Sequence, residues 1–208
     1  MKLYDFSYSS SAYRVRIALA LKKLSHESQS VHLRKGEQHQ PWYPEINPQA
    51  MVPALFGDHG LITQSLAIIE YLEELHPEPP LLPRDPGDRA RARALAMAIV
   101  AEIQPIQNLR VLDYLGDTYK LDSDATRAWA QHWIEPGLAA FQKLLGPAKG
   151  KYCLGDQVML PDIVLVPQMV NARRFRCDLA GLGRLVEIDT ALRALPAFRD
   201  TAPPPQSS

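Results

Sequence analysis

Cysteine is scarce in this sequence, and so are the patterns that build metal or disulfide sites. The 208 residues include two cysteines, Cys153 and Cys177. Two cysteines in a chain of this length make no disulfide framework and do not have the spacing of a zinc site. The six histidines are scattered without a ligand-like repeat. We therefore expect no metal ion.

The sequence also lacks a net charge and a long apolar run. Its 23 basic residues equal its 23 acidic residues, so no electrostatic argument favours a nucleic acid or an anionic membrane as a partner. No apolar stretch has the length that spans a bilayer, and nothing resembles a signal peptide. The expected location is therefore the cytoplasm.

The first 80 residues predict a small α/β domain. The composition of the whole chain, with 46% hydrophobic and 22% charged residues, is typical of a globular protein. Alternating apolar residues indicate strands, and an amphipathic spacing indicates helices. Strands are expected over 2–6 and 28–33, at a third position entered through 47–55, and at 61–62, with helices over about 11–23 and over 64–75. The order is βαβ-ββα, which implies a parallel pair of strands at the start.

The second half predicts a separate all-helical domain. Five prolines among residues 76–88 end the preceding helix and make a stiff connection. The chain is then rich in alanine and poor in turns, with helices expected over 89–116 (interrupted at Pro105), 123–145, 160–175 and 184–195. The expected division is a domain over 1–80, a linker over 81–88, a helical domain over 89–200 and a flexible tail over 201–208.

Three consecutive serines, Ser9 to Ser11, stand between the first strand and the first helix. Serine is a favoured N-cap residue, so capping is one interpretation. A helix N-terminus is also electropositive and has unpaired N–H groups, so the same hydroxyls can hold an anion such as a thiolate. The serines alone do not decide between these roles.

Two further features fit a peptide-like ligand. Pro53 enters a strand, where it lacks a hydrogen-bond donor, and a cis Val52–Pro53 bond would turn the Val52 backbone outward to pair with an extended ligand. An ordinary trans proline at a strand start is the alternative. Gln64 and Ser65 open a helix whose N-terminus suits a carboxylate, although plain capping is again the more common role.

Taken in order, these features resemble the zeta class of glutathione transferases, which includes the maleylacetoacetate isomerases. The segments that carry the resemblance span nearly the whole chain: Ser9 to Leu19, similar to the zeta Ser-Ser-Cys-x-x-Arg-x-Arg-Ile-Ala motif; Asn47-Pro48 through Val52-Pro53; Gln64 to Leu72; Ile103 to Asn108; Gly155-Asp156 through Asp162; and Val166-Pro167-Gln168 with Asn171 to Phe175. The resemblance implies a thioredoxin-like N-terminal domain that binds glutathione, an all-α C-terminal domain that shapes the acceptor pocket, and a homodimer.

The resemblance also assigns roles to residues. Ser9, Ser10 and Ser11 would surround the glutathione sulfur, with Ser9 favoured for stabilising the thiolate. The further glutathione contacts it implies are Arg14, Gln38, Val52, Pro53, Gln64, Ser65, Gln104 and Asn108. The candidates for binding substrate carboxylates are Arg174, which matches the pocket arginine of the family, and Arg14, Arg110 and Arg176. Solvated helix ends are the alternative for two of the three arginines at 173, 174 and 176.

The chemistry of the serine turn agrees with this assignment. A thiol has a reference pKa of about 8.5, and a helix N-terminus with hydroxyl donors can lower that pKa to near or below about 7. The resulting thiolate can add beside the double bond of a conjugated diketo acid. Rotation about the new single bond and elimination then give the trans isomer and return glutathione unchanged. A substrate with carboxylates needs cations, for which arginine is well suited.

The chain departs from the family pattern at three places. Ser11 stands where the family usually has cysteine, so chemistry that needs an enzyme thiol is not expected. Tyr8 and Leu109 stand where the maleylpyruvate isomerases, close relatives, have arginine. Met159 stands where this fold commonly has a Ser or Thr N-cap, and Asp162 is expected to accept N–H bonds there instead.

The function that follows is a glutathione-dependent cis–trans isomerase of aromatic degradation, converting maleylacetoacetate to fumarylacetoacetate. The alternatives that remain open are a maleylpyruvate isomerase, a glutathione-conjugating transferase with loose acceptor choice, and a binding module without turnover. The complete set of Ser9, Val52-Pro53 and Gln64-Ser65 argues against the last of these.

Overall fold

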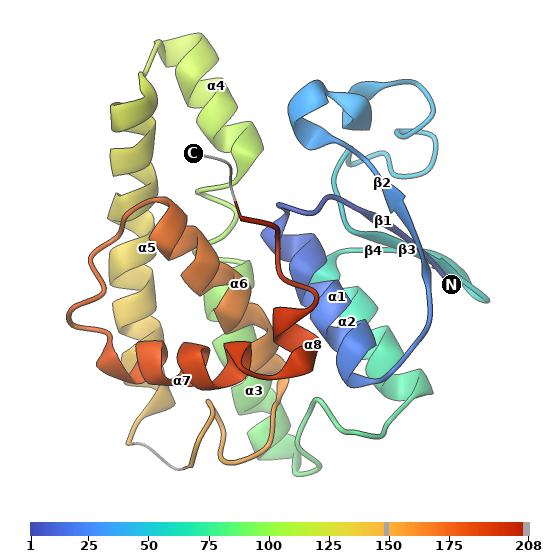
Figure 1. Ribbon diagram of the computed structural model, residues 1–208, viewed down its shortest axis with the longest axis vertical. Coiled ribbons are helices and arrows are strands. Elements are labelled where there is room, and N and C mark those ends of the chain that lie inside the picture. The colour runs from blue at the N-terminus through green and yellow to red at the C-terminus, as the bar shows by residue number, and fades with distance from the viewer. Residues whose placement is uncertain (148–149, 206–208) are drawn as a thin grey trace. The chain divides into compact units, whose positions relative to one another are not determined.

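The chain folds into two compact units. The structure, a computed structural model, describes residues 1–147 and 150–205 (Figure 1). The contacts group residues 1–80 with the segment that begins at Leu195 into one unit, and Leu81–Ala194 into the other. Residues 206–208 of the expected tail lie outside the described residues.

A four-stranded sheet forms the centre of the N-terminal unit. Its strands are β1 (Lys2–Asp5), β2 (Glu27–Ser30), β3 (Ala54–Gly57) and β4 (Gly60–Thr63). The strand order is β2-β1-β3-β4, with β1 parallel to β2 and the other pairs antiparallel. The parallel pair is joined by a crossover helix, because parallel strands cannot be joined by a tight turn. The predicted βαβ-ββα order is confirmed.

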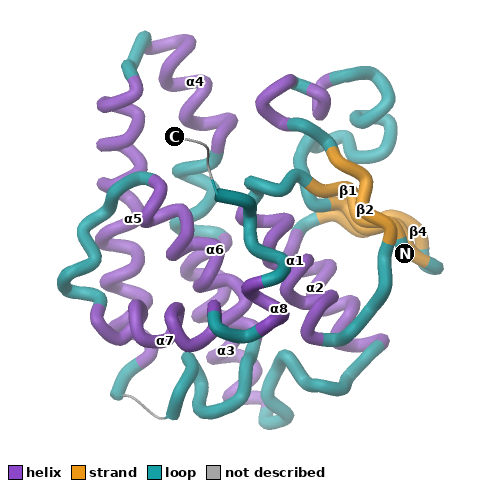
Figure 2. Tube along the Cα trace, viewed as in Figure 1, coloured by secondary structure: helices purple, strands orange, loops and turns teal. Residues whose placement is uncertain are grey.

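Two helices lie on the same side of this sheet (Figure 2). Helix α1 spans Ser10–Leu21 and helix α2 spans Ser65–Leu75, and the two pack against each other. Side chains of both helices, including Val15, Ile17 and Ile68, are fully buried. Because each such burial stabilises the fold by about 1.5–3 kcal/mol, packing fixes the positions of both helices and of their N-termini.

Arg16 joins three segments of the N-terminal unit. Its Nη1 donates to both carboxylate oxygens of Asp5, at 2.6 and 2.9 Å, and its Nη2 donates to the carbonyl oxygen of Ser7 at 3.0 Å. Its Nε donates to the carbonyl oxygen of Thr201, also at 3.0 Å. One guanidinium therefore fixes the end of β1, the turn that leads into α1 and the C-terminal segment.

The C-terminal segment, which begins at Leu195, belongs to the N-terminal unit. The sequence had instead placed residues up to 200 in the helical domain and 201–208 in a tail. The segment contains the short helix α8 (Pro196–Arg199), which packs on α1. The hydroxyl of Tyr13 donates to the carbonyl oxygen of Phe198 at 2.6 Å, and Phe198 is fully buried. Contacts between residues this far apart in sequence leave no local pattern, so periodicity could not reveal them.

The expected linker over 81–88 is likewise part of a folded unit, the helical one. Leu81 and Leu82 are buried, and the backbone N–H of Leu160 donates to the carbonyl oxygen of Leu81 at 2.7 Å. The prolines stiffen this segment, but its two leucines give it an apolar anchor in the helical core.

The helical unit is built around one buried helix. Its helices are α3 (Pro86–Val100), α4 (Leu109–Tyr119), α5 (Ser123–Leu145), α6 (Leu160–Arg174) and α7 (Gly183–Arg193). Every residue of α6 from Leu160 to Met169 is buried, and α6 packs against α3, α5 and α7. A helix without a polar face belongs in a core, which explains its central place. None of the helices within the described ranges combines the length and apolar character needed to cross a membrane.

The stretch 89–116, predicted as a helix interrupted at Pro105, forms two helices, and Pro105 lies in the segment between Val100 and Leu109. An irregular turn connects α3 to α4 and carries Ile103, which packs against Gly137 of α5. A Cβ at Gly137 would lie 2.6 Å from Cγ1 of Ile103. Glycine at this position therefore allows the turn to approach α5 closely.

Asp162 organises the start of α6. One carboxylate oxygen accepts from the backbone N–H of Met159 at 2.8 Å, and the other accepts from that of Cys153 at 2.9 Å. Asp162 thus accepts N–H bonds as expected where Met159 replaces a hydroxyl cap. Burial raises the pKa of Asp162 to about 6, although the two N–H bonds act in the opposite direction.

We expect Arg16→Met to lower the free energy of unfolding by about 3 kcal/mol, because it leaves the carboxylate of Asp5 mostly buried without its cation. Urea unfolding followed by circular dichroism measures the loss. Arg199→Met is the matched control, because Arg199 lies in the same C-terminal segment but its ion pair with Asp200 is exposed. An equal loss in both variants would contradict the role given to the Arg16 cluster.

The raised pKa of Asp162 predicts a pH dependence of stability. Between about pH 4 and pH 6 the unfolded chain releases this proton while the folded chain keeps it, so the contribution of Asp162 to stability falls as the pH rises. The cost of Asp162→Asn should therefore be greater at about pH 4.5 than at about pH 7.5, by on the order of 2 kcal/mol. Urea unfolding of both proteins at both pH values tests this, and a greater cost at the higher pH contradicts it.

Candidate functional site

Ser9 is the N-cap of α1. Its backbone is extended, and its Oγ accepts a hydrogen bond from the N–H of Ala12 at 3.2 Å. Ser10 and Ser11 form the first turn of the helix and are partly exposed. A hydroxyl carries one donor and two acceptor lone pairs, so the cap uses a lone pair and leaves the O–H able to donate. Capping and thiolate stabilisation are therefore compatible roles for Ser9.

The loop before β3 is held by two donors on one carbonyl. The Tyr43 hydroxyl and the Asn47 Nδ2 both donate to the carbonyl oxygen of Met51, each at 2.7 Å. The Val52–Pro53 peptide bond that follows is cis, one of the two geometries considered from the sequence. Within the described residues, no hydrogen bond reaches the backbone N–H or C=O of Val52. Both groups remain able to pair with an extended ligand.

The start of α2 has no side-chain cap. Gln64 precedes the helix with a φ of 71°, in the left-handed region, and makes no capping hydrogen bond. Its Nε2 donates instead to Oε1 of Gln49 at 2.9 Å. Ser65, the first helical residue, is buried. The N–H groups of this turn are therefore suited to an anion.

Arg14 contacts Ser65 from within the unit. Its side chain is fully buried, and its Nη1 donates to Oγ of Ser65 at 3.2 Å. Burial lowers the pKa of Arg14 to about 9, because a desolvated guanidinium is less stable as a cation. The structure thus places two of the predicted site residues in direct contact.

Gln38 lies in a short 3₁₀ helix, Glu37–His39, of the same unit. Its Oε1 is buried and has no hydrogen-bond partner among the described residues. Among the described residues of the N-terminal unit, polar groups without partners therefore include those at Gln38, Val52 and Arg14. Such groups fit a polar, peptide-like cofactor, because buried polar groups are normally hydrogen-bonded.

The helical unit carries the remaining candidates on separate elements. Gln104 lies buried in the turn after α3, and Asn108 caps α4 by accepting from the N–H of Arg110 at 3.3 Å. Arg174 and Arg176 are exposed at the end of α6, and Arg174 lies over the ring of Phe175.

The neighbouring Arg173 has a different task. It pairs with the buried Asp189 of α7 at 2.5 Å and so ties α6 to α7. Among Arg173, Arg174 and Arg176, Arg173 therefore has a structural role.

Both cysteines are free thiols of the helical unit. Burial raises the pKa of Cys153 well above its ordinary value and that of Cys177 to about 11. Both thiols are therefore poor nucleophiles near neutral pH. Among the described residues, no group of three or more His, Cys, Asp or Glu side chains could hold a metal ion.

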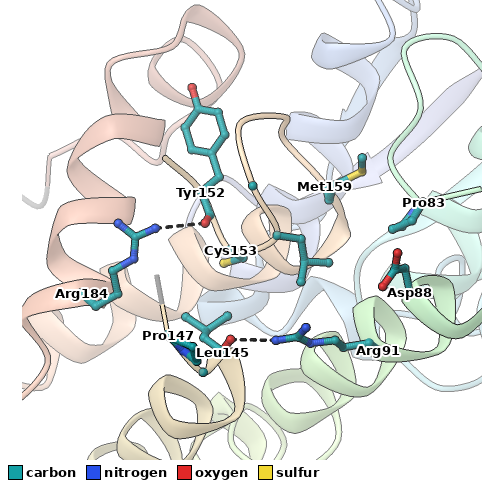
Figure 3. A pocket seen from close by; sticks show the side chains of 12 residues that line it. Pro83, Asp88, Arg91, Leu145, Pro147, Tyr152, Cys153, Met159 and Arg184 are labelled. Carbon is teal, nitrogen blue, oxygen red and sulfur yellow. Dashed lines mark hydrogen bonds between the residues drawn. The ribbon is translucent and has the colours of Figure 1, made fainter. Parts of the chain in front are cut away.

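A cavity of about 300 Å³ also lies in the helical unit (Figure 3). The guanidinium groups of Arg91 and Arg184 lie on opposite sides of it. Arg91 donates to the carbonyl oxygen of Leu145 at 2.8 Å, and Arg184 donates to that of Tyr152 at 3.2 Å. Arg91 thus holds the end of α5 and Arg184 holds loop backbone, and none of the predicted site residues lines the cavity.

Sequence reasoning missed two groups that support the candidate site. Arg16 anchors the turn before Ser9, and Tyr43 with Asn47 holds the loop before Val52. Arg16 and Asn47 stand in the motifs that carried the family resemblance, but their spacing does not reveal their partners. Tyr43 had no recognisable signal.

Comparisons with known proteins agree with the geometry. Residues 3–80 match the family model described as the glutathione S-transferase N-terminal domain. The chain is 45% identical to maleylacetoacetate isomerase of Pseudomonas aeruginosa, over 98% of this chain and 96% of that protein.

Two solved structures extend the match to the whole fold. A holo maleylpyruvate isomerase, described as a bacterial zeta-class glutathione S-transferase, is 44% identical with a TM-score of 0.96 and full coverage of both chains. Maleylacetoacetate isomerase of Methylobacterium extorquens AM1, with bound malonate and glutathione, is 37% identical with a TM-score of 0.94, over 100% of this chain and 98% of that one. A thioredoxin-like domain followed by a helical domain, with this identity over nearly the whole length, leads to one conclusion: the chain belongs to the zeta class of glutathione transferases, the family of the maleylacetoacetate isomerases.

Proposed function

We propose that this protein is a glutathione-dependent cis–trans isomerase that converts maleylacetoacetate to fumarylacetoacetate. The observation that carries the proposal is the Ser9 hydroxyl at the N-terminus of α1, which caps the helix and keeps its O–H able to donate to a thiolate. The relatives named above, one of them with bound glutathione and malonate, support both the cofactor and an acidic substrate.

The residues of the N-terminal unit fit glutathione. When bound, glutathione supplies the thiolate that adds reversibly to the conjugated double bond, which allows rotation before the thiolate leaves. Ser9 and the start of α1 stabilise that negative charge, with Ser10 and Ser11 beside them. The unpaired backbone of Val52, next to Pro53, pairs with the tripeptide, and Gln64 with Ser65 receives its γ-glutamyl carboxylate. Gln38 contributes its unpartnered amide oxygen to the same ligand.

The residues of the helical unit would serve the acceptor substrate. Arg174 is the first candidate for a substrate carboxylate, because guanidinium binds carboxylate in a planar, bidentate way. Arg110 and Arg176 are further candidates, and Gln104 and Asn108 are proposed to complete the glutathione contacts.

A maleylpyruvate isomerase is the second candidate function. The TM-score of 0.96 to a maleylpyruvate isomerase favours it. Tyr8 and Leu109 favour maleylacetoacetate, since the resemblance to maleylpyruvate isomerases would place arginine at both positions. A glutathione-conjugating transferase remains a third candidate. A homodimer in the cytoplasm completes the proposal, on the resemblance to the family.

We expect the purified protein to accelerate maleylacetoacetate isomerisation only when glutathione is present, because the chain itself offers no low-pKa thiol. Absorbance assays with maleylacetoacetate, with maleylpyruvate and with an aromatic chloride for conjugation distinguish the three candidates. Faster turnover of maleylpyruvate would favour the second candidate. Good conjugation without isomerisation would reject both isomerase functions.

We expect Ser9→Ala to lower the isomerisation rate by more than about tenfold, roughly 1.4 kcal/mol, and to raise the pKa of the bound glutathione thiol. Ser10→Ala and Ser11→Ala should have smaller effects. Steady-state rates and the ultraviolet absorbance of the bound thiolate measure the two quantities.

The matched control for the lost cap is Asp122→Ala, which removes the N-cap of α5 and should cost about 1 kcal/mol of stability without changing the thiol pKa. If none of the serine variants changes the rate by tenfold, the helix N-terminus alone stabilises the thiolate and the hydroxyl role is wrong.

A further inference from the structure

Arg14 stands out among the basic residues of α1 and its C-cap because it has no anionic partner among the described residues. Arg16 pairs with Asp5, and Lys22 pairs with Glu73 at 2.7 Å. The side chain of Arg14 is fully buried, yet within the described part of the chain its Nε and Nη2 have no hydrogen-bond partner. A buried charge without a counter-ion destabilises a fold. The burial of an unpaired Arg14 is therefore unusual and calls for an explanation.

The side-chain hydrogen bond that Arg14 makes within the described residues indicates where an anion could bind. Its Nη1 donates to Oγ of Ser65, the first residue of α2. The helix begins there without a side-chain cap, and its N–H groups add positive potential to that of the guanidinium. Two independent features, an uncapped helix N-terminus and a buried unpaired cation, therefore converge on one position.

We propose that Arg14 is a positioning residue for the ligand carboxylate at Ser65, and that it acts through the Ser65 hydroxyl and through its charge without leaving the protein interior. The proposal rests on the proposed function, in which that carboxylate is the one on the γ-glutamyl end of glutathione. The sequence suggested that Arg14 contacts the ligand directly. The proposal instead gives Arg14 an indirect role through Ser65.

The hydrogen bond sets the direction of the Ser65 hydroxyl. Because Oγ accepts from Arg14, the O–H of Ser65 is left to donate, and the carboxylate is the acceptor it meets. The buried cation behind Ser65 polarises this donor and stabilises the bound negative charge. A ligand that lacks the carboxylate gains nothing from either effect.

Isothermal titration with two peptides tests the proposal. One is glutathione, and the other is γ-aminobutyryl-cysteinyl-glycine, which differs only by loss of the γ-glutamyl carboxylate. For Arg14→Met we expect glutathione to bind at least about tenfold more weakly and the analogue to change by less than about twofold, as for loss of a charge-assisted hydrogen bond. In isomerase assays the same variant should raise the KM for glutathione more than it lowers kcat.

Variants of the same two helices separate positioning from folding. Lys22→Met removes the other buried cation between α1 and α2, at Glu73 near the far end of α2, so it should lower stability and leave the ratio of the two affinities unchanged. Arg14→Lys should restore part of the glutathione affinity, because it restores charge without the guanidinium geometry. Ser65→Ala should lower the same ratio, and combining it with Arg14→Met should give less than the sum of the two effects.

The outcomes are distinct. If Arg14→Met weakens the binding of both peptides equally, Arg14 has a merely structural role and the proposal is overturned. The proposal is also overturned if the variant weakens the binding of neither peptide. If Arg14→Met does not fold, Arg14→Lys and Ser65→Ala decide by the same two-peptide comparison. A wild-type protein that binds glutathione but does not isomerise leaves the proposal standing and rejects the proposed function. A wild-type protein that binds neither peptide overturns both.

Discussion

The guanidinium of Arg16 is the interaction on which the geometry of the N-terminal unit depends. It binds Asp5 at the end of β1, the carbonyl of Ser7 in the turn and the carbonyl of Thr201 in the C-terminal segment. Ser9, the N-cap of α1, follows that turn directly, so the contacts of Arg16 also fix the position of the Ser9 hydroxyl. The donor role proposed for Ser9 requires a hydroxyl held to within a fraction of an ångström, and the three contacts of the Arg16 guanidinium supply such a restraint.

Helix α1 and its C-cap carry three basic residues, Arg14, Arg16 and Lys22, with different contacts. Arg16 fixes the turn before the helix, and Lys22, buried against Glu73 and backbone carbonyls, fastens α1 to α2 and the segment that follows it. Arg14 precedes both in sequence and has no carboxylate partner among the described residues. The two paired cations stabilise the unit by themselves, whereas an unpaired one is stabilised only when an anion arrives. This contrast separates the two paired charges from Arg14, the residue that we propose to act on a ligand.

The helical unit relies on buried carboxylates in a similar way. Asp162 satisfies two backbone N–H groups at the start of α6, and Asp189 pairs with Arg173 at the other end of that helix. Both keep the most buried helix of the unit in register with its neighbours. The exposed Arg174 and Arg176, the arginines proposed to bind substrate carboxylates, lie at the end of this well-packed helix.

The sequence by itself determined the order of elements, because hydrophobic periodicity, capping residues and prolines act over a few residues. The limits of α5, the βαβ-ββα order of elements and the serine turn were all readable in this way, whereas the family was recognised from its motifs. Only the tertiary structure decided that the segment around Phe198 returns to α1, that 81–88 is anchored by Leu81, and that Arg14 lacks a counter-ion while Arg16 has one. Each of these depends on contacts between residues distant in the chain, and the partner of a charge is set by where the fold brings its neighbours.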